Sequence, residues 1–564
     1  MKISGAKITV EVLIEQGIDT VFGYPGNQVI DLFDELYLSR ERITHILTAH
    51  EQGAAHAADG YARATGKVGV CIATSGPGAT NLVTGIANAF LDSVPLVAIT
   101  GNVSCSLIGR DSFQEVDIVG VTMPVTKHNF IVKDIRELAD TLRSAFKIAK
   151  SGRPGPVLVD IPKDVQTGIW DFEPKPEPVR PYPLSFASES KLRKAAEMIS
   201  AAKRPYIYFG GGIIAGKASK ELKKLAEKTD SPLGCSLMGL SALPADYPRF
   251  LGMSGMHGHY AATKAEDEAD LVIALGVRFS DRATGSGSRF NRNFSIIHID
   301  IDNAELNKNV ASDLTIQGDI KDALFRLLPM LDEVRHPEWA ARIEEIRADE
   351  KARTDSALNA AKKLHTGKIA PYTIIDTISR YASEGDIIAT DVGQHQMWTA
   401  QRYPLIKPRT FISSGGLGTM GFGMGAAIGA AKATGRRAIL FTGDGSFGMD
   451  MNELATAVSQ GVPLVVVIMN NGVLGMVRQW QTALYGKRYS GTTLNRKTDF
   501  AKIAEAFGAK GGRASSTDEL EKLAAEAFAY DGTFVIDCAV DSDEVVLPAF
   551  PPNGTIDDII TGIE

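Results

Sequence analysis

The chain has 564 residues, of which 44% are hydrophobic and 23% charged, and a formal net charge of −7. This length predicts several domains, and the negative charge without a long basic run argues against nucleic acid as a partner. The four cysteines lie far apart and form no C-x-x-C pair, so they predict buried apolar side chains and no disulfide scaffold or zinc site. No signal-peptide pattern or bilayer-length apolar run is present, so we expect a cytoplasmic protein without membrane association.

Two seams divide the chain into three parts. The first is the proline-rich stretch 171–185, and the second is the charged, Ala-rich stretch 335–368, which predicts a solvated helix followed by a connection. Each part alternates short β-branched runs with helical patterns, as is typical of parallel α/β layers. The predicted fold class is therefore α/β with three doubly wound parallel-sheet domains. We expect these domains at 1–172, 186–335 and 368–547, followed by a C-terminal tail at 548–564.

In the first part, residues 48–66 predict a helix with Glu51 near its start. A carboxylate is favourable at a helix N-terminus, so capping is the simplest role for Glu51. Residues 68–102 then predict a strand, a Gly-Pro-Gly turn, a helix and a second strand. Residues 437–471 have the same order with Gly-Asp-Gly in the turn. This similarity indicates a duplicated domain, and chance likeness of two βαβ units is the alternative.

The middle part contains predicted strand ends that carry Gly, Arg or Asp, in residues 206–216, 271–285 and 296–302. The glycines in 206–216 have the spacing G-x-G-x-x-x-G, which is not the dinucleotide-binding fingerprint. Taken alone, this segment is a weak signal of a nucleotide site.

In the last part, Asp444 stands between two glycines at the end of an apolar run. Backbone N–H groups usually bind phosphates at such a turn, and a carboxylate would repel them unless a cation lies between. Mg²⁺ prefers oxygen ligands of this kind, and neighbouring strands would bring the amide oxygen of Asn471 beside Asp444. A helix expected to start near Phe447 would offer its N-terminus to the same phosphates. Taken alone, Gly-Asp-Gly could be a tight turn and Asn-Asn could be a helix cap.

Gly-Asp-Gly followed at this spacing by Asn-Asn resembles the cofactor motif of thiamin-diphosphate enzymes. The resemblance implies that Asp444, the Asn471 side chain and the Val473 main chain hold Mg²⁺, which bridges the cofactor diphosphate. Met420 would enforce the bent shape of the cofactor, although core filling is the alternative for this methionine. The residues that the resemblance places against the cofactor are Gly393, Gln394, His395, Gly418, Met420, Gly443, Asp444, Gly445, Ser446, Asn471 and Met476.

Residues 50–63 resemble the helix that carries the activating glutamate of this family, which implies a catalytic role for Glu51. Its carboxylate would bond the aminopyrimidine ring of thiamin diphosphate and favour the tautomer that accepts the C2 proton. The family usually places this glutamate and the Gly-Asp-Gly site on different subunits. The resemblance therefore implies a homodimer or a larger assembly with its active site at the subunit interface.

Residues 470–490 look like the segment after the metal site in the biosynthetic, FAD-containing catalytic subunit of acetohydroxyacid (acetolactate) synthase, and the likeness covers essentially the whole chain. It implies transfer of a two-carbon unit from pyruvate to a second pyruvate, giving 2-acetolactate, or to 2-ketobutyrate, giving 2-aceto-2-hydroxybutyrate. Trp480 would line the acceptor pocket, where one methylene is worth roughly 1–3 kcal/mol, and a core or interface role is its alternative. Gln114 is the other catalytic residue implied. The implied channel residues are Phe113, Lys163 and Val477.

With residues 255–258, the middle part looks like the FAD-binding pieces of the same synthases. Neither product needs a redox change, so FAD would be structural. The family also implies a small regulatory subunit as a possible partner. Asn27 and Gln28 depart from the family, which usually has a glycine and a small residue there. The resemblance therefore does not determine the shape of the channel. The residues that would touch FAD are Arg153, Met256, His257, Gly276, Arg278, Arg282, Asp300 and Asp319.

Two other kinds of protein remain as alternatives. One is another flavin-containing thiamin enzyme, such as a pyruvate oxidase or a glyoxylate carboligase, although the carboligase is expected to lack the activating glutamate. The other is a non-catalytic nucleotide-binding or regulatory protein, which gives no reason for Glu51, Asp444 and Asn471 to occur together.

Overall fold

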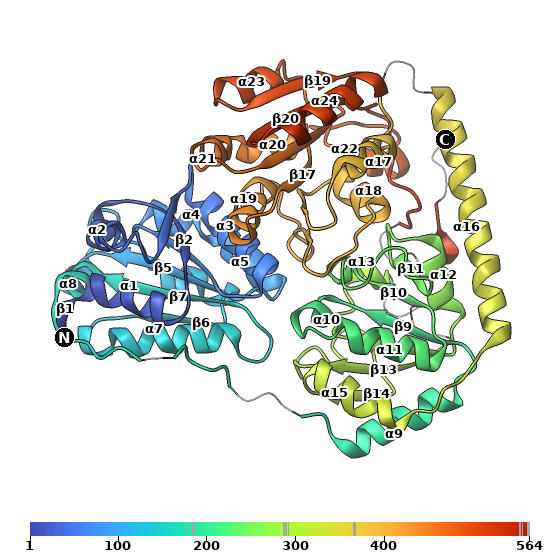
Figure 1. The fold of residues 1–564 in the computed structure, drawn as a ribbon, viewed down its shortest axis with the longest axis horizontal. Coiled ribbons are helices and arrows are strands. Elements are labelled where there is room, and N and C mark those ends of the chain that lie inside the picture. The colour runs from blue at the N-terminus through green and yellow to red at the C-terminus, as the bar shows by residue number, and fades with distance from the viewer. Residues whose placement is uncertain are drawn as a thin grey trace.

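The computed structural model describes residues 1–564 except 176, 183–185, 286–289, 291–292, 365–367, 552–553, 555 and 561–564, and it leaves the side chains of 356–364 undescribed. Three six-stranded parallel sheets, each flanked by helices, form three domains (Figure 1). The expected α/β fold class is confirmed. Parts of the two predicted seams and of the predicted C-terminal tail lie outside the described residues.

The N-terminal sheet has the strand order β3-β2-β4-β5-β7-β6. Its central strands are buried on both faces, which is why they are nearly continuous apolar runs. Its strands are β2 (Thr20–Tyr24), β3 (Thr44–Leu47), β4 (Gly69–Ala73), β5 (Leu96–Asn102), β6 (His128–Ile131) and β7 (Pro156–Pro162). A short antiparallel pair, β1 (Lys2–Ser4) with β8 (Ile169–Asp171), lies beside this sheet.

The C-terminal sheet has the order β16-β15-β17-β18-β20-β19. Numbered within each domain, both outer sheets therefore follow the order 2-1-3-4-6-5. The similarity of layout expected from the sequence is confirmed at the level of topology. The C-terminal strands are β15 (Ile387–Thr390), β16 (Phe411–Ile412), β17 (Ala438–Gly443), β18 (Leu464–Asn470), β19 (Lys510–Ala514) and β20 (Thr533–Ala539).

The central sheet has a different order, β11-β10-β9-β12-β13-β14, which is 3-2-1-4-5-6 within the domain. This is the order of dinucleotide-binding folds, in which ligands bind at the carboxyl ends of the two middle strands. The glycine spacing alone was a weak signal, so the topology strengthens the case for a nucleotide-type ligand. The central strands are β9 (Pro205–Phe209), β10 (Leu233–Cys235), β11 (Phe250–Met253), β12 (Leu271–Leu275), β13 (Ser295–Asp300) and β14 (Leu314–Gln317).

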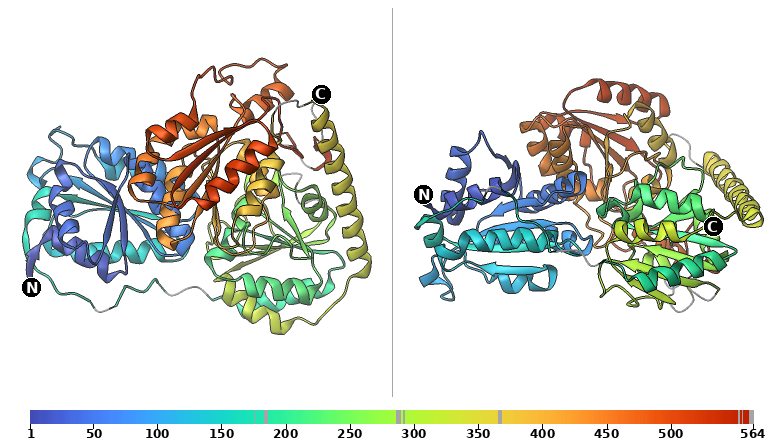
Figure 2. Two further views of the ribbon diagram at one scale, coloured as in Figure 1. Left: turned by 45° about the horizontal axis from the view of Figure 1, so that its top comes forward. Right: turned by 60° about the horizontal axis from the view of Figure 1, so that its bottom comes forward.

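Helices cover both faces of each sheet (Figure 2). Those of the N-terminal domain are α1 (Gly5–Glu15), α2 (Ile30–Leu38), α3 (Glu51–Thr65), α4 (Pro77–Asn81), α5 (Val83–Leu91), α6 (Ile118–Thr122), α7 (Ile135–Lys150) and α8 (Lys163–Thr167). Those of the central domain and its exit are α9 (Glu189–Ala201), α10 (Gly211–Ala215), α11 (Ser219–Thr229), α12 (Tyr260–Glu268), α13 (Asp281–Thr284), α15 (Ile320–Leu327) and α16 (Pro337–Leu364). Those of the C-terminal domain are α17 (Pro371–Tyr381), α18 (Gln394–Arg402), α19 (Gly423–Thr434), α20 (Asp444–Asp450), α21 (Leu454–Ser459), α22 (Gly475–Leu484), α23 (Phe500–Ala506) and α24 (Thr517–Ala529).

The outer domains meet where α3 packs along α19 at the middle of the molecule (Figure 1). Glycines make this approach possible: a Cβ at Gly60 or Gly429 would overlap the backbone of the facing helix, and one at Gly425 would lie 2.8 Å from the Gly53 carbonyl oxygen. The segment 413–430 is rich in glycine, and α3 is the helix that approaches its backbone closely.

The long helix α16 corrects one expectation. The charged stretch 335–368 predicted a solvated helix, but Trp339, Ile343 and Ile346 on its first turns are buried against the central domain. The Trp339 indole also donates a hydrogen bond to the Pro205 carbonyl oxygen at 3.1 Å. This apolar stripe packs the start of α16 against the central domain, and the helix runs along the edge of the molecule (Figure 1).

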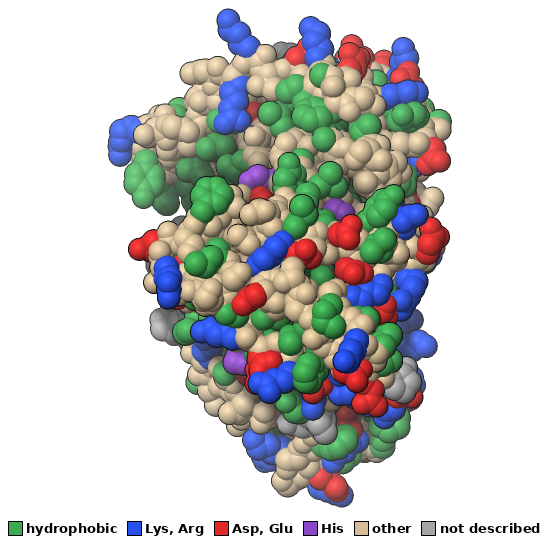
Figure 3. All heavy atoms as spheres, turned by 90° about the vertical axis from the view of Figure 1, so that its left-hand side faces the viewer, with side chains coloured by type: hydrophobic (Ala, Val, Ile, Leu, Met, Phe, Trp, Pro, Cys, Tyr) green, Lys and Arg blue, Asp and Glu red, His purple; other side chains and the backbone are tan. Residues whose placement is uncertain are grey.

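Three of the four cysteines are buried as expected, whereas Cys105 is only partly buried. On the outer face of the N-terminal domain, Lys and Arg side chains are interspersed with Asp and Glu (Figure 3). Within the described part of the chain, no helix is both long enough and apolar enough to cross a membrane.

Candidate functional site

Two neighbouring strands of the C-terminal sheet deliver the predicted metal ligands. The register of β17 and β18 pairs Gly443 with Met469, so Asp444 and Asn471 leave the same sheet edge side by side. Asp444 is the first residue of α20. The helix expected to start near Phe447 therefore begins three residues earlier, because the chain turns directly from β17 into the helix.

The carboxylate of Asp444 lies in a poorly solvated place, with 6% of the residue exposed. Burial raises the pKa of Asp444 to about 6, and the backbone amides of Asp444 and Asn471 offset part of this rise. An anion held this way is more stable beside a cation. The electrostatics thus fit a divalent metal at this turn.

The Asn471 amide is oriented by hydrogen bonds at both of its ends. Its Oδ1 accepts a hydrogen bond from the Val473 backbone amide at 3.2 Å, and its Nδ2 donates to Gln394 Oε1 at 3.2 Å. Gln394 in turn donates through Nε2 to the Glu544 carbonyl oxygen at 2.8 Å. These bonds fix the orientation of the Asn471 side chain beside the main chain of Val473.

His395 supplies the clearest sign that a ligand belongs here. The side chain is buried, and its Nε2 has no hydrogen-bond partner within the described residues. Burial lowers the pKa of His395 to about 3, so the imidazole is neutral and its unpartnered Nε2 is available to a ligand. A Cβ at Gly443 would lie 3.0 Å from His395 Nδ1. The predicted cofactor residues Gly393 and Gly443 leave the space that this imidazole fills.

The glycine-rich segment before α19 lies over the metal turn. A Cβ at Gly445 would lie 2.7 Å from Leu474 Cδ2 and 3.6 Å from Met420 Cε, so the glycine makes room for both side chains. Gly418 has φ +69°, a left-handed conformation that glycine adopts without strain. Met420 thus sits beside Gly-Asp-Gly, where a wedge under a cofactor would stand. Ser446 closes the turn by donating to the Val392 carbonyl oxygen at 2.8 Å.

Two buried acids that the sequence reasoning missed hold this segment in place. Asp391 accepts a hydrogen bond from the Gly421 amide at 3.0 Å, and Asp450 accepts one from the Met424 amide at 3.0 Å. Burial raises the pKa of both carboxyls, and their mutual repulsion adds to the rise at Asp450. Both acids stand inside motifs that the sequence singles out, at the ends of "DVG" and "GDGSFGMD", but their partners are distant in sequence.

The N-terminal domain also holds the glycine-rich segment, which sequence reasoning did not foresee. Asp92 accepts hydrogen bonds from the amides of Gly415 at 3.0 Å and Gly416 at 2.7 Å. Asn88 accepts one from the Ser414 hydroxyl at 2.6 Å. These contacts fix the position of Met420 and Gly418 from across the domain boundary.

Glu51 belongs to a second cluster, built by the N-terminal domain. It is the first residue of α3, and its Oε2 accepts a hydrogen bond from Asn81 Nδ2 at 3.0 Å. A Cβ at Gly78 would lie 3.3 Å from Glu51 Oε1, and one at Gly76 would lie 2.8 Å from the Gln114 carbonyl oxygen. The Gly-Pro-Gly turn therefore brings Glu51 and Gln114 together.

The predicted channel residues fall into two groups. Phe113 and Val477 are 80% and 53% exposed, so in a single chain neither is enclosed, and a channel at these residues needs another surface opposite them. Lys163 is buried deeper, where it forms an ion pair with Asp31 and donates to the Asn27 carbonyl oxygen at 3.3 Å. The loop at Asn27 and Gln28, where the sequence departs from the family pattern, is thus held by a predicted channel residue.

In the central domain, the turns that follow β9 and β12 meet at the carboxyl edge of the sheet. Gly276 has φ +58°, and a Cβ at Gly212 would lie 2.6 Å from the Gly276 Cα, so the two turns touch backbone to backbone. Asp300 at the end of β13 has a pKa raised to about 6 by burial. His257 is buried, its Nδ1 has no partner within the described residues, and burial lowers its pKa to about 4. An elongated polar ligand fits these groups.

The other predicted FAD residues already have protein partners. Arg153 donates to Glu305 Oε1 at 2.5 Å, and Asp319 caps α15 by accepting the Asp322 amide at 2.9 Å. Arg282 Nη1 lies 3.5 Å from Met256 Sδ. A Cβ at Gly416 would lie 3.1 Å from Arg278 Nη2, so Arg278 reaches the glycine-rich segment. Such contacts leave a role at FAD open to test.

Trp480 on α22 lies beside the central domain, and α22 follows the predicted metal ligands in the chain. Its ring centroid lies 6.2 Å from that of His257, with the ring planes at 44°. Gln479, which the sequence reasoning passed over, is buried and exchanges two hydrogen bonds with the Val546 backbone, at 3.1 Å and 2.9 Å. Met476 and Val477 lie on the same helix, which follows the metal ligands directly.

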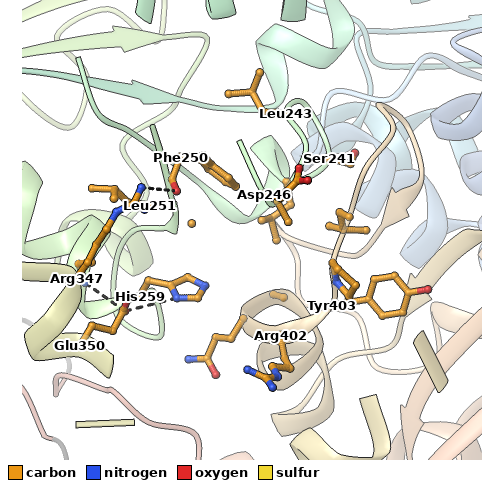
Figure 4. A pocket seen from close by; sticks show the side chains of 18 residues that line it. Ser241, Leu243, Asp246, Phe250, Leu251, His259, Arg347, Glu350, Arg402 and Tyr403 are labelled. Atoms are coloured by element: carbon orange, nitrogen blue, oxygen red, sulfur yellow. Dashed lines mark hydrogen bonds and ion pairs between the residues drawn. The ribbon is translucent and has the colours of Figure 1, made fainter. Parts of the chain in front are cut away.

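A separate cavity of about 430 Å³ lies between the central and C-terminal domains (Figure 4). Its lining includes Ser241, His259, Arg347, Glu350 and Arg402, and it contains none of the predicted site residues. Several of its charges are already paired, since Glu350 lies 3.5 Å from His259 Nδ1 and Arg402 binds Asp376 outside the cavity. The candidate active site is therefore assigned to the strand ends and not to this cavity.

Three comparisons with protein domain families cover most of the chain. Residues 3–121 match the thiamine pyrophosphate enzyme N-terminal TPP binding domain, residues 192–327 match the central domain, and residues 391–538 match the C-terminal TPP binding domain.

Curated proteins of similar length also match. The chain is 45% identical to the probable acetolactate synthase large subunit of Methanocaldococcus jannaschii, over 99% of this chain and 95% of that protein. It is 42% identical to the acetolactate synthase isozyme 3 large subunit of Escherichia coli, over 99% of this chain and 98% of that protein. It is 44% identical to the isozyme 1 large subunit of the same organism, over 98% of this chain and 96% of that protein.

Proposed function

Because this chain belongs to the acetolactate synthase large subunits, within the thiamine pyrophosphate enzymes, we propose which of its residues carry the reaction. The chain is a thiamin-diphosphate-dependent enzyme that transfers two-carbon units and makes 2-acetolactate from pyruvate. The resemblance found in the sequence is thereby confirmed, and the pyruvate oxidase, glyoxylate carboligase and non-catalytic alternatives are set aside.

Asp444, the Asn471 side chain and the Val473 carbonyl hold Mg²⁺ in this proposal. The observation that carries it is the buried Asp444 carboxylate, whose raised pKa and position beside Asn471 fit a cation at this edge. Gly393, Gln394, His395 and the Gly443–Ser446 turn surround the diphosphate, and His395 contacts it through its unpartnered Nε2. Gly418, Met420 and Met476 hold the rings of the cofactor.

Thiamin diphosphate, when bound, supplies a nucleophilic carbon and an electron sink for the loss of CO₂. Glu51 holds the proton that is exchanged with the aminopyrimidine ring, and Asn81 keeps its carboxylate in place. The backbone of Gln114 lies against the same Gly-Pro-Gly turn, and its side chain contacts substrate. Phe113, Lys163 and Val477 line the approach to the site and exclude water.

FAD is the third cofactor of the proposal and has a structural role, because acetolactate formation needs no redox change. Three features support an elongated ligand at the carboxyl ends of β9 and β12. They are the strand order, the buried Asp300 and the unpartnered Nδ1 of His257. Met256, His257, Gly276, Arg278, Arg282, Asp300 and Asp319 would hold it, and Arg153 would have to give up its contact with Glu305.

Self-association completes the site. Glu51 makes its polar contact within the N-terminal domain, and the exposed Phe113 and Val477 lack an opposite wall in one chain. A second copy of the chain therefore supplies the missing wall, with Glu51 of one copy serving the cofactor held by the other. A small regulatory subunit is a further proposed partner, since the similar proteins are named large subunits.

Trp480 selects the second substrate in this proposal. It lies beside His257 at the side of the site where the acceptor enters, and a flat ring there favours the longer 2-ketobutyrate, giving 2-aceto-2-hydroxybutyrate. A contact with one methylene is worth roughly 1–3 kcal/mol, or about 10- to 200-fold in preference.

The deciding experiment incubates the purified protein with pyruvate and 2-ketobutyrate in competition, with and without FAD. We expect both acetohydroxy acids, a flavin that stays oxidised, and a ratio of products that shifts toward 2-acetolactate in Trp480→Leu. Reduced flavin without a carboligation product would contradict the proposal, and an unchanged product ratio in Trp480→Leu would remove Trp480 from it.

A further inference from the structure

The helix that carries Glu51 begins against an acid from the other end of the chain. Glu453 closes the short helix η6 (Met451–Glu453) of the C-terminal domain, and only 1% of it is exposed. Its Oε1 accepts a hydrogen bond from the His50 amide at 3.0 Å, and its Oε2 accepts one from the Ala49 amide at 3.2 Å. These amides immediately precede Glu51.

The hydroxyl of Thr456 completes this contact. It donates to Glu453 Oε2 at 2.6 Å and accepts from the Ala49 amide at 3.0 Å. Burial raises the pKa of Glu453, while the Thr456 hydroxyl and the two backbone amides counteract that rise. A carboxylate bonded to the free amides of a helix start is favourable because it meets the positive end of the helix dipole.

The fit is also steric. A Cβ at Gly53 would overlap Glu453 Oε1, so only glycine lets the carboxylate reach the first turn of α3. Both sides of the contact are therefore shaped for each other: an acid on one domain, and a glycine with two free amides on the other.

Glu453 is tied equally firmly to the proposed metal site. It stands nine residues after Asp444, at the end of the continuous run of α20 and η6. Asp450 on that run accepts the Met424 amide, which fixes it against α19. One short segment thus starts at the proposed Mg²⁺ ligand and ends at the backbone in front of Glu51.

We propose that Glu453 is a positioning residue that sets the orientation of Glu51, so that one rigid segment connects the diphosphate site of a chain with the activating carboxylate that the same chain provides to its partner copy. The inference rests on the proposed role of Glu51. Glu453 itself does not touch the reacting atoms, because both of its oxygens are occupied by backbone amides and Thr456. Misplacing a reacting group by about 1 Å can slow a reaction by about 100-fold.

The test compares Glu453→Ala, Glu453→Gln and Glu51→Gln with the unmodified protein. Glutamine can keep the geometry, since its oxygen can accept from His50 while its amide donates to Thr456, which still accepts from Ala49. We expect Glu453→Ala to lower kcat about 10- to 100-fold with less than threefold change in thiamin diphosphate affinity and pyruvate KM. Glu453→Gln should recover most of that loss.

Two readouts separate positioning from general damage. The first is hydrogen–deuterium exchange at C2 of bound thiamin diphosphate, followed by NMR, which reports on Glu51 without turnover. The second is backbone amide exchange by mass spectrometry in the cofactor-free protein, where residues 49–53 should exchange faster in Glu453→Ala. Asp270→Ala is the matched control, because Asp270 also accepts two consecutive backbone amides, those of Lys203 and Arg204, but within the central domain.

The outcomes distinguish the positioning role of Glu453 from the activating role of Glu51. Slow C2 exchange in both Glu51→Gln and Glu453→Ala, with cofactor affinity retained and Asp270→Ala like the unmodified protein, supports the inference. Slow exchange in Glu51→Gln but unchanged exchange in Glu453→Ala overturns it. Unchanged exchange in Glu51→Gln overturns the role of Glu51 itself. If Glu453→Ala does not fold, Thr456→Val tests the same contact, with an expected two- to fivefold loss of kcat, and no loss overturns the inference.

Discussion

The third strand of the N-terminal sheet, β4, and the third strand of the C-terminal sheet, β17, have the same place in sheets with the same strand order. Both lead into a short helix through a glycine-flanked residue, at Gly76–Gly78 where α4 starts in one and at Gly443–Gly445 where α20 starts in the other. The first turn has proline between its glycines and the second has Asp444. The scaffolds match, and the chemistry of the turns differs.

The difference shows how one layout can serve two tasks. At β17 the charge is on the turn itself, where burial and the neighbouring Asn471 suit it to a metal. At β4 the turn is neutral, and Gly78 instead makes room for a charge on the helix before that strand, Glu51 of α3. In the proposed function, the N-terminal domain therefore presents an acid for proton transfer, and the C-terminal domain presents one for binding.

The largest expected effect comes from removing the charge at β17. Asp444→Asn keeps the size of the side chain but loses the anionic metal ligand, so we expect Mg²⁺-dependent binding of thiamin diphosphate to disappear from calorimetric titrations, and turnover with it. Asp537→Asn is the control, because this buried carboxylate lies two strands away, on β20, and bonds Asn470. If Asp444→Asn bound thiamin diphosphate with an affinity within threefold of that of the unmodified protein, the metal assignment would be wrong.

The second effect comes from removing the charge beside β4. Glu51→Gln should bind cofactor and Mg²⁺ normally and lose about 100- to 10,000-fold in kcat, because proton transfer by a positioned group contributes about that much. Calorimetry and steady-state rates of acetolactate formation measure the two quantities on one preparation. If both acids lowered affinity equally, the division of tasks between the two turns would be wrong.

Much of this comparison could be predicted from the sequence. Gly-Asp-Gly at a strand end and Asn471 at the next strand end are local features, and parallel strands bring them together without further information. The helix starting at Glu51 is local as well. For the same reason the two domains of equal layout were visible in the sequence.

The contacts that align the two turns could not be predicted. Glu453 meets His50 across 403 residues, and Asp92 meets Gly415 across 323, so no local pattern marks either pair. The buried half of α16 was hidden by its many alanines and charges, among which Trp339 and two isoleucines make a short stripe. The strand order of the central sheet also needed the structure, since its glycine spacing departs from the known fingerprint.

A third prediction uses pH to sharpen the contrast. In the cofactor-free protein the pKa of Asp444 is raised to about 6, above its ordinary value of 3.8. Between these values the folded chain binds more protons than the unfolded chain, so the destabilisation by Asp444 grows as pH rises through this window. We therefore expect cofactor-free Asp444→Asn to melt at a higher temperature than the unmodified protein at pH 7.

That difference in melting temperature should shrink as pH falls from 7 to 5, because the unmodified carboxyl becomes protonated. Adding thiamin diphosphate and Mg²⁺ at pH 7 should reverse the order, since only the unmodified protein gains the metal. Differential scanning calorimetry of both proteins measures this. Melting temperatures that differ by the same amount at pH 5 and pH 7 would show that Asp444 does not titrate in this window.

The smallest expected effect tests the glycines that frame the two acids. A Cβ in Gly78→Ala would lie 3.3 Å from Glu51 Oε1 and 2.8 Å from Thr74 Cγ2, so the carboxylate must shift by a few tenths of an ångström. We expect about a three- to tenfold loss of kcat with cofactor affinity unchanged. In Gly445→Ala the added carbon meets Leu474 and Met420 instead, so cofactor affinity should fall by a similar factor. Equal losses of affinity in both variants would mean that the turn at β4 also binds the cofactor, and the two strand ends would then share one task.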